Sequence, residues 1–456
     1  MKAFWTLWLI VTVVTLPAHA QTAAPSLQQE AEAALIAGQP AETARLAQLI
    51  LETQPDSFAP LFLLALGQSD LGDLPTAAKT GAQAYRAAAS EAQRFEAARF
   101  VASTRFQAEQ YTRAELWLRR AANHAQTVEE RQSVAGAYQA SVEANPLSLK
   151  FSAFVAPSDN INKGSEEGVL RLESIGVTFV LPEDRRSLSG VAFSASSELQ
   201  YRISQSPQQE THLIGTFFSE TYVLSSEAKS LLASSPNPDV RNIDGSDLAA
   251  TTASVGISRQ QNNISPLGPV KFGASFGTYL EGGERLVNFR DLSIEQIVPI
   301  DRINTFSLLV ATREQDALSP TLLDSTAYDL VGTYNRVLAN NDQLQLTFSG
   351  RHKDAGPESS FDEVQLGVGY AVAEPIWGAQ LSTSARFGYR VFDEFVTTLD
   401  GREDVFVSAS ATATFQDFSY FGFSPSLSLS AERTESSAEE NSFSTVQLLF
   451  GVQSNF

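Results

Sequence analysis

Beyond about residue 145 the chain alternates apolar and polar side chains with a period of two over long segments. In SGVAFSASSELQYRIS, one face runs from Val191 to Ile203 and is largely apolar, and small or polar residues occupy the positions between. The same alternation recurs in DVFVSASATATF, FGFSPSLSLSA and TVQLLFGVQSNF. A strict period of two indicates a strand whose two faces meet unlike surroundings. The fold of this part must therefore give each strand one apolar side and one polar side.

A soluble β-sandwich and a transmembrane β-barrel both satisfy that requirement. Sandwich strands are usually short, with a modal length of about 5–6 residues, whereas the alternating segments here run for about ten or more, as in barrels. A closed barrel also leaves no unpaired strand edge in lipid. We therefore expect a transmembrane antiparallel β-barrel over residues 146–456. An even number of strands, about fourteen, would return the chain to the side from which it entered.

The last alternating segment has the pattern of a barrel assembly signal. Its apolar face is interrupted only by Ser454 and consists of Val446, Leu448, Phe450, Val452 and Phe456. Such a segment ending on an aromatic residue resembles the C-terminal sequence by which outer-membrane barrels are recognised for assembly. The pattern predicts outer-membrane lipids and the barrel assembly machinery as partners.

The N-terminus predicts export. MKAFWTLWLIVTVVTLPAHA has a basic residue, Lys2, then an apolar run from Phe4 to Leu16, and then an Ala-His-Ala sequence. This is the order of a secretory signal peptide, and the apolar run is too short to span a bilayer. We predict a signal peptide over residues 1–20, cleaved between Ala20 and Gln21.

Between the signal peptide and the alternating segments, residues 21–145 have a helical period. Turns begin at Gly38, Gly72 and Glu109, with spacings of 34 and 37 residues, and an alanine follows each turn within the next helix (Ala44, Ala78 and Ala114). A helix–turn–helix unit repeating near 34 residues is typical of tetratricopeptide (TPR) repeats, which bind partners on a concave face. We expect a TPR-like periplasmic helical domain; an irregular helical domain is the alternative.

Composition excludes several classes of function. The chain contains no cysteine, which excludes disulfides, thiol chemistry and attachment of a lipid through an N-terminal cysteine. It carries 52 acidic and 32 basic residues, a formal net charge of -20. Because this balance gives no basic footprint, we expect no nucleic-acid partner.

Candidate chemical sites are few. After the signal peptide only His124, His212 and His352 remain, and none has the spacing of a metal site. His352 lies near Asp354 in GRHKDAG, where we expect a solvated surface loop. We therefore predict no catalytic residue, no cofactor and no metal site, and that the protein is not an enzyme.

The segment PSDNINKGSEEG carries Asp159, Asn160 and Asn162 directly after the first alternating segment. Asn and Asp side chains bond nearby backbone groups and tolerate left-handed geometry, so the segment predicts a tight hydrogen-bonded turn. Calcium ligation is the alternative, but the spacing lacks the later glutamate of an EF-hand.

Taken together, the signal peptide, short helical repeat region, D-N-I-N segment, FGFSPSLSLSAER and terminal Phe456 resemble the surface lipoprotein assembly modulator (Slam) family. The resemblance covers essentially the whole mature chain. It implies a 14-stranded outer-membrane barrel with a periplasmic helical domain that moves client proteins, mostly lipoproteins, to the cell surface of Gram-negative bacteria. We therefore expect an outer-membrane translocon whose partner is a client lipoprotein or secreted protein. The alternatives are an exopolysaccharide exporter with a TPR domain and a diffusive porin.

Overall fold

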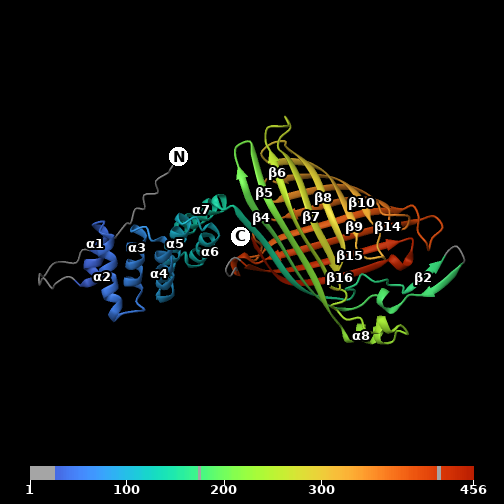
Figure 1. Cartoon of the computed structure of the whole chain (residues 1–456), viewed down its shortest axis with the longest axis horizontal. Coiled ribbons are helices and arrows are strands. Elements are labelled where there is room, and N and C mark those ends of the chain that lie inside the picture. Colours follow the sequence, from blue (N-terminus) through green and yellow to red (C-terminus); the bar gives the residue numbers. More distant parts are fainter. Residues whose placement is uncertain (1–25, 173–175, 419–422, 456) are drawn as a thin grey trace. The chain divides into compact units, whose positions relative to one another are not determined.

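The computed structural model describes residues 26–172, 176–418 and 423–455, so Ala20, Gln21 and Phe456 lie outside the described residues. The described chain begins with helices and continues with strands (Figure 1). The helices before the first strand are α1 (Leu27–Ile36), α2 (Pro40–Thr53), α3 (Phe58–Asp70), α4 (Leu74–Ala87), α5 (Glu91–Gln107), α6 (Tyr111–His124) and α7 (Val128–Ala144). The chain divides into two compact units between Ala137 and Tyr138, within α7. The predicted boundary between a periplasmic domain and a barrel domain at residue 145 stays a prediction.

The first unit is built from helical hairpins. The helices α2, α4 and α6 begin just after Gly38, Gly72 and Glu109, and all three of these turn residues have positive φ, between 57° and 82°. Glycine adopts this conformation without strain, which explains the turns at Gly38 and Gly72; at the third turn a glutamate adopts it. Consecutive helices are then held by buried small and aliphatic side chains, including Ala31, Leu46, Ala47, Leu63 and Leu64. Within the described part of the chain, no helix has the length and apolarity to cross a membrane.

The second unit is a closed antiparallel β-barrel of fourteen strands among the described residues, as the alternation predicts. Each strand pairs with its neighbours in the chain, and β1 closes the ring by pairing with β16 on one side and β4 on the other. The barrel strands are β1 (Leu147–Ser158), β4 (Gly190–Gln205), β5 (Gln209–Leu224), β6 (Ala250–Gln261), β7 (Val270–Glu281), β8 (Glu284–Pro299), β9 (Asn304–Ala317), β10 (Ser325–Val337), β11 (Gln343–Asp354), β12 (Phe361–Ala371), β13 (Gln380–Phe392), β14 (Arg402–Thr414), β15 (Phe423–Ser436) and β16 (Phe443–Asn455).

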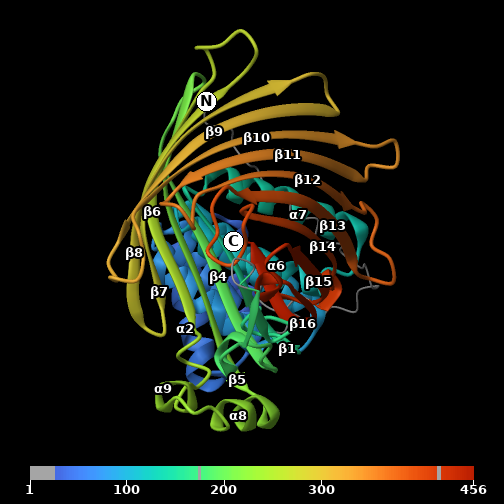
Figure 2. The ribbon, with the colours of Figure 1, turned by 90° about the vertical axis from the view of Figure 1, so that its right-hand side faces the viewer.

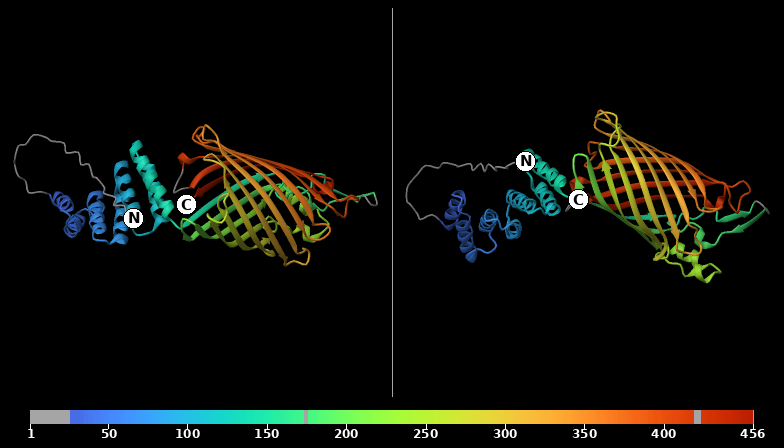
Figure 3. Two further views of the ribbon diagram at one scale, coloured as in Figure 1. Left: turned by 90° about the horizontal axis from the view of Figure 1, so that it is seen from above. Right: turned by 45° about the horizontal axis from the view of Figure 1, so that its top comes forward.

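The outer surface of the barrel is apolar. Large aliphatic and aromatic side chains are exposed at every second position, for example Leu308 and Val310 on β9 or Leu366 and Val368 on β12. Exposed apolar rows on every side of a closed barrel are what a lipid-facing surface requires. On β16 the row predicted from the sequence is exposed in the same way, at 56% for Val446 and 53% for Phe450. Figures 2 and 3 show these strands from further directions, inclined to the barrel axis.

The two ends of the barrel differ. At one end, which we call the turn end, β1 begins and β16 finishes, and the connections are short. At the other, the loop end, the two longest connections, 159–189 and 225–249, and the shorter connection 437–442 join the strands β1, β4, β5, β6, β15 and β16. The first of these carries the two-stranded hairpin β2 (Val169–Leu172) and β3 (Val177–Val180), and short 3-10 turns lie at η1 (Glu183–Arg185), η2 (Gln416–Phe418) and η3 (Glu439–Asn441).

The connection 225–249 contains two short helices. It forms α8 (Ser226–Ala233) and α9 (Pro238–Arg241), which lie beyond the end of β5 (Figures 1 and 2). Ser225 caps α8 by accepting from the Ala228 amide at 3.0 Å. The apolar side chains of this connection form a buried cluster with the connection 159–189: Ile161, Leu188, Leu224, Ala228, Leu232 and Val240. The loop end therefore has its own small core beside the closure of the barrel.

Candidate functional site

The lumen-facing positions alternate with the exposed apolar rows. In the central part of the wall many of them are serine or threonine, and neighbouring strands share hydroxyl–hydroxyl hydrogen bonds. These pairs are Ser152–Ser196 at 2.7 Å, Thr216–Ser254 at 2.6 Å, Ser384–Ser410 at 2.9 Å and Thr412–Ser428 at 2.8 Å. Such pairs satisfy both partners without charge and leave a small, polar inner surface.

Nearer the loop end, charged side chains form a belt across the inner faces of β8 to β14. Five of them stand directly opposite one another on successive strands, in the order Asp329, Arg351, Glu363, Arg390 and Asp404. Their signs alternate, so each charge has an opposite charge beside it. Asp291 and Arg313 form a further cross-strand pair on β8 and β9, and Arg402 lies two residues before Asp404. We call these eight residues the charged belt.

The ion pairs of the charged belt are short. Arg313 donates to Asp291 at 2.6 and 3.0 Å, and Arg351 donates to Asp329 at 2.6 Å. The other two pairs are Arg390–Glu363 at 2.7 Å and Arg402–Asp404 at 2.8 and 2.6 Å. The carboxylates of the latter two pairs are almost fully buried, with side-chain exposures of 4% for Glu363 and 1% for Asp404. Charge-assisted pairs of this geometry fix both side chains.

Aromatic rings support the arginines of the charged belt. The guanidinium of Arg313 lies 4.4 Å from the Phe289 ring centre, and that of Arg390 lies 4.7 Å from Phe361. Stacking on an aromatic face restricts the planar guanidinium, and the carboxylate occupies its edge. Because the belt contains four acids and four bases, it forms a rigid polar wall whose formal charges cancel.

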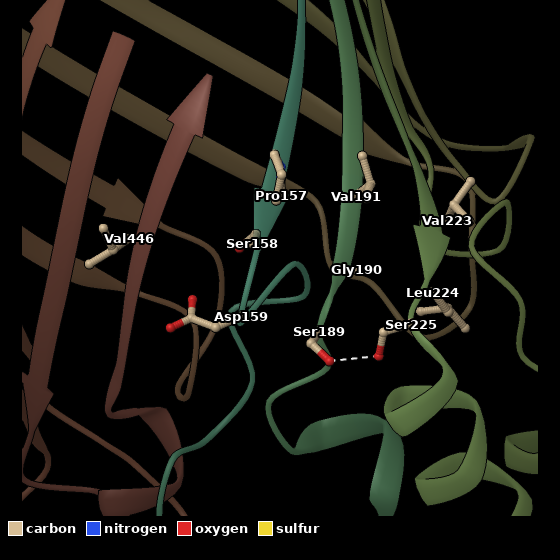
Figure 4. A pocket seen from close by; sticks show the side chains of 10 residues that line it. All are labelled: Pro157, Ser158, Asp159, Ser189, Gly190, Val191, Val223, Leu224, Ser225 and Val446. Atoms are coloured by element: carbon tan, nitrogen blue, oxygen red, sulfur yellow. Dashed lines mark hydrogen bonds between the residues drawn. The ribbon is translucent and has the colours of Figure 1, made fainter. Parts of the chain in front are cut away.

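The ladder that closes the barrel, between β1 and β16, is interrupted. Pairs run from Lys150–Asn455 to Val155–Phe450 and resume at Ser158–Gln447. They skip Ala156 and Pro157, and the nitrogen of Pro157 (Figure 4) has no hydrogen to donate. In the continuous part of this ladder, Gly451 of β16 allows the backbone of β1 to approach closely. A Cβ at that position would overlap the carbonyl oxygen of Ala153 and the ring of Phe154.

Beyond the interruption, side chains and loop backbone replace the ladder. The Asn160 amide nitrogen donates to the Ser444 carbonyl at 3.3 Å, and Lys163 pairs with Glu432 at 2.7 Å. The Ser158 and Thr445 hydroxyls bond at 3.2 Å. Farther along, the Glu166 amide donates to the Ser442 carbonyl at 3.3 Å, and Arg171 pairs with Glu439 at 3.1 Å. We call these contacts of residues 158–171 with residues 432–445 the clasp.

The two asparagines of D-N-I-N organise the clasp. Asn160 is 2% exposed, exchanges hydrogen bonds with Gly164 at 2.8 and 2.9 Å, and thereby closes the turn predicted from the sequence. Asn162 donates to the carbonyls of Asp184 and Arg186 and accepts from the Leu188 amide at 3.0 Å. The side-chain carboxylate of Asp159 accepts from the Thr445 hydroxyl at 3.5 Å. The segment therefore joins the two halves of the connection 159–189 by hydrogen bonds.

Other residues singled out in the sequence are placed as follows. Val446, Leu448, Phe450 and Val452 lie on the lipid-facing side of β16. The expectation that His352 sits on a surface loop is wrong, because it lies within β11 and its Nδ1 is 2.7 Å from Asp362 rather than paired with Asp354. Among the described residues no group of three or more His, Asp or Glu side chains is arranged to hold a metal ion.

Sequence reasoning missed the charged belt. Each strand contributes only one or two of its charges, and their partners lie 22 residues away for Arg351 and 27 for Arg390. Only the register between strands brings them into one row. A recurring charge near the loop end of successive predicted strands is the signal that would have indicated the belt.

No known family model matches this chain, and no curated protein sequence matches it. Among solved structures, OccAB4 of Acinetobacter baumannii covers 68% of this chain and 99% of its own, at 9% identity and a TM-score of 0.33. The outer membrane protein OpdK of Pseudomonas aeruginosa covers 68% and 99%, at 8% identity and a TM-score of 0.33. A double mutant of MamA (RS-1) covers 26% and 64%, at 17% identity and a TM-score of 0.23. The fold assignment rests on the strand pairing described above.

Proposed function

We propose that this protein is an outer-membrane translocon that delivers surface lipoproteins or other exported client proteins to the cell surface. The observation that carries the proposal is the clasp. The two sequence patches that resemble the Slam family, D-N-I-N and FGFSPSLSLSAER, are far apart in the chain. Lys163, the residue directly after D-N-I-N, forms an ion pair at 2.7 Å with Glu432 of FGFSPSLSLSAER. The two patches therefore lie together at the barrel closure, which supports a common role for them.

The link between helices and barrel supports the same function. The helix α7 ends at Ala144 and β1 begins at Leu147. Arg202 of β4 donates to the carbonyls of Glu143 and Ala144 at 2.8 and 3.2 Å, so a barrel strand satisfies the C-terminal carbonyls of the last helix. The C-terminal end of α7, which belongs to the second unit, is thus held by a strand of the barrel.

The proposal includes an orientation. The turn end and the helical unit face the periplasm, the loop end and its clasp face the cell surface, and residues 1–20 are removed on export. The helical repeats hold the client near the periplasmic end, and the lumen gives it a route outward. The apolar row of β16 and Phe456 engage the barrel assembly machinery. No step of this route requires a cofactor, a metal or a catalytic residue.

The decisive experiment is deletion of the gene followed by labelling of intact cells with a membrane-impermeant reagent. We expect one or a few surface proteins to be lost and to accumulate in the periplasm, and a plasmid copy of the gene to restore them. An unchanged set of surface proteins together with loss of an exopolysaccharide would contradict the translocon and favour an exopolysaccharide exporter.

A diffusive porin is the second candidate, because the hydroxyl-lined wall and the charged belt form a polar inner surface suited to small hydrophilic solutes. Planar-bilayer recording separates the two. A steady open conductance with uptake of small solutes, and no change of surface proteins on deletion, would favour the porin. A channel that conducts poorly until a client is added would favour the translocon.

A further inference from the structure

Two arginines of the helical unit converge on one neutral group. Arg105 lies in the last turn of α5 and Arg113 in the first turn of α6, and Gln110 lies between them at the start of α6. The Arg105 Nη1 donates to the Gln110 Oε1 at 2.6 Å, and the Arg113 Nη1 donates to the same oxygen at 3.3 Å. The two guanidinium groups therefore share a single amide oxygen.

This arrangement lacks the negative charge that two adjacent cations require. Within the described residues, neither of these guanidinium groups has a carboxylate partner, whereas Arg99 on α5 pairs with Glu96 at 3.2 Å. The Arg105 Nε is buried without an acceptor. Burial, followed by the charge of Arg113, lowers the pKa of Arg105 below its usual value, because both disfavour the charged form. Two positive charges thus meet at a place where the helices supply only a neutral acceptor.

The first turn of α6 adds to the positive potential. Gln110 is the N-cap, but its side chain forms no capping hydrogen bond, and the first turn contains no acidic residue. The N-terminal end of a helix carries a partial positive charge that favours an anion. At the same connection between α5 and α6, the rings of Phe106 and Tyr111 pack edge to face at 5.3 Å, and Phe106 is 39% exposed. Favourable charge for an anion therefore lies next to an exposed aromatic surface.

We propose that Arg105 and Arg113 form a binding site for a carboxylate of an acidic segment in the exported client protein. The carboxylate lies between the two guanidinium groups in place of the Gln110 amide oxygen, and a neighbouring apolar side chain of the client contacts Phe106. A carboxylate binds guanidinium groups more strongly than an amide does, because the hydrogen bonds join opposite charges. The choice of a client protein as the ligand rests on the proposed function, whereas the anion site rests only on the contacts between α5 and α6.

The test uses the full-length protein purified in detergent and a fluorescein-labelled hexaglutamate peptide, whose binding is followed by fluorescence anisotropy. Hexaglutamine with the same label is the neutral comparison. We expect wild type to bind hexaglutamate several-fold more tightly than hexaglutamine, even though the whole chain carries a formal net charge of -20. Arg105→Gln and Arg113→Gln should each weaken the binding of hexaglutamate several-fold, and the double variant should bind the two peptides equally.

The matched control is Arg99→Gln, which removes the same charge from α5 but from an arginine that already has a carboxylate partner. It should bind hexaglutamate as tightly as wild type does. Equal weakening by Arg99→Gln and Arg113→Gln would overturn the site, as would equal binding of the two peptides by wild type. Because Arg113 is exposed, its substitution should leave the helical circular dichroism signal unchanged, which separates lost binding from lost folding.

Competition against the labelled peptide distinguishes the classes of ligand. If polyglucuronate or inorganic phosphate displaces it at a lower concentration than unlabelled hexaglutamate does, the assignment to an acidic polypeptide is overturned. The site and the translocon can also fail separately. Binding that depends on Arg105 and Arg113, in a protein whose gene deletion leaves the surface proteins unchanged, would support the anion site and contradict the translocon.

Discussion

The two walls of the barrel are held by different means. The wall from β8 to β14 has continuous ladders and the charged belt, in which every arginine has a carboxylate at its edge. The closing wall, from β15 through β16 and β1 to β4, has small hydroxyl side chains, an interrupted ladder and a clasp formed by loops. The wall from β8 to β14 is held by ion pairs between lumen-facing side chains. The closing wall is held by contacts of the loops beyond the ends of its strands.

The charged belt makes one wall of the barrel rigid, whereas the clasp helps to close the barrel between β1 and β16. A wall whose ion pairs are buried at Glu363 and Asp404 resists local opening, because separating the partners leaves a charge without compensation. The closing wall has no such penalty within its ladder. Its closure depends on the fit of Gly451 against Phe154 and on hydrogen bonds of the loop segment near Asn160. Substitutions in the two walls should therefore fail in different ways.

The largest effect is expected from Gly451→Val. A side chain there overlaps the backbone of β1, so the barrel cannot close and two strand edges remain unpaired in lipid, which costs several kcal/mol per unsatisfied group. The folded, heat-modifiable band on unboiled gels should be nearly lost. The control is Gly369→Ala on β12, whose added Cβ would meet its nearest neighbour at an ordinary 3.6 Å. A normal folded band for Gly451→Val would show that the closing wall tolerates an added side chain as well as the opposite wall does.

The next largest effect is expected from Glu363→Gln in the charged belt. It leaves the Arg390 guanidinium without its carboxylate. Breaking a buried pair costs about 3–5 kcal/mol, and we expect about 2 kcal/mol here because the Arg390 side chain is 32% exposed. The temperature at which the gel band shifts should fall, and the reversal potential in a salt gradient should move toward anion selectivity. Glu435→Gln, whose side chain is 66% exposed, is the control and should change neither.

The sequence predicted the repeated helical hairpins and the fourteen-stranded barrel because both depend on local periodicity. The turns at Gly38 and Gly72 needed only the residues around them. The charged belt and the clasp could not be predicted in the same way. Arg390 and Glu363 become partners only through strand register, and Lys163 meets Glu432 only because the first and last strands pair. Helix α8 was missed because its apolar side depends on packing against residues such as Leu188, far away in the chain.

A smaller effect is expected from Asn160→Ala in the clasp. It removes hydrogen bonds to Gly164 and Ser444 and leaves buried backbone groups unsatisfied, at a cost of about 1–3 kcal/mol. The barrel ladders are untouched, so the folded gel band should persist. Trypsin added to intact cells should cut the connection 159–189 several-fold faster. Asn441→Ala, which removes a single 3.5 Å hydrogen bond in the neighbouring connection, should leave the cutting rate unchanged.

The smallest effect concerns the helical unit, whose stability is unrelated to either wall. We predict that residues 21–145 fold alone with a helical circular dichroism spectrum; a disordered or β-rich spectrum would refute this.

Within the fragment, the hydrogen bond from His124, followed by that from Arg94, lowers the pKa of Glu91 below its usual value. A lowered folded-state pKa means that Glu91 contributes stability above the ordinary glutamate pKa of about 4.3, and that this contribution is lost as the pH falls through the lowered value. Glu91→Gln should therefore lower the melting temperature slightly at pH 6 and have less effect at pH 3. In a His124→Ala background most of this difference should vanish, because the largest cause of the shift is gone. An equal effect of Glu91→Gln at both pH values would show that the carboxylate charge is not what stabilises this contact between α5 and α6.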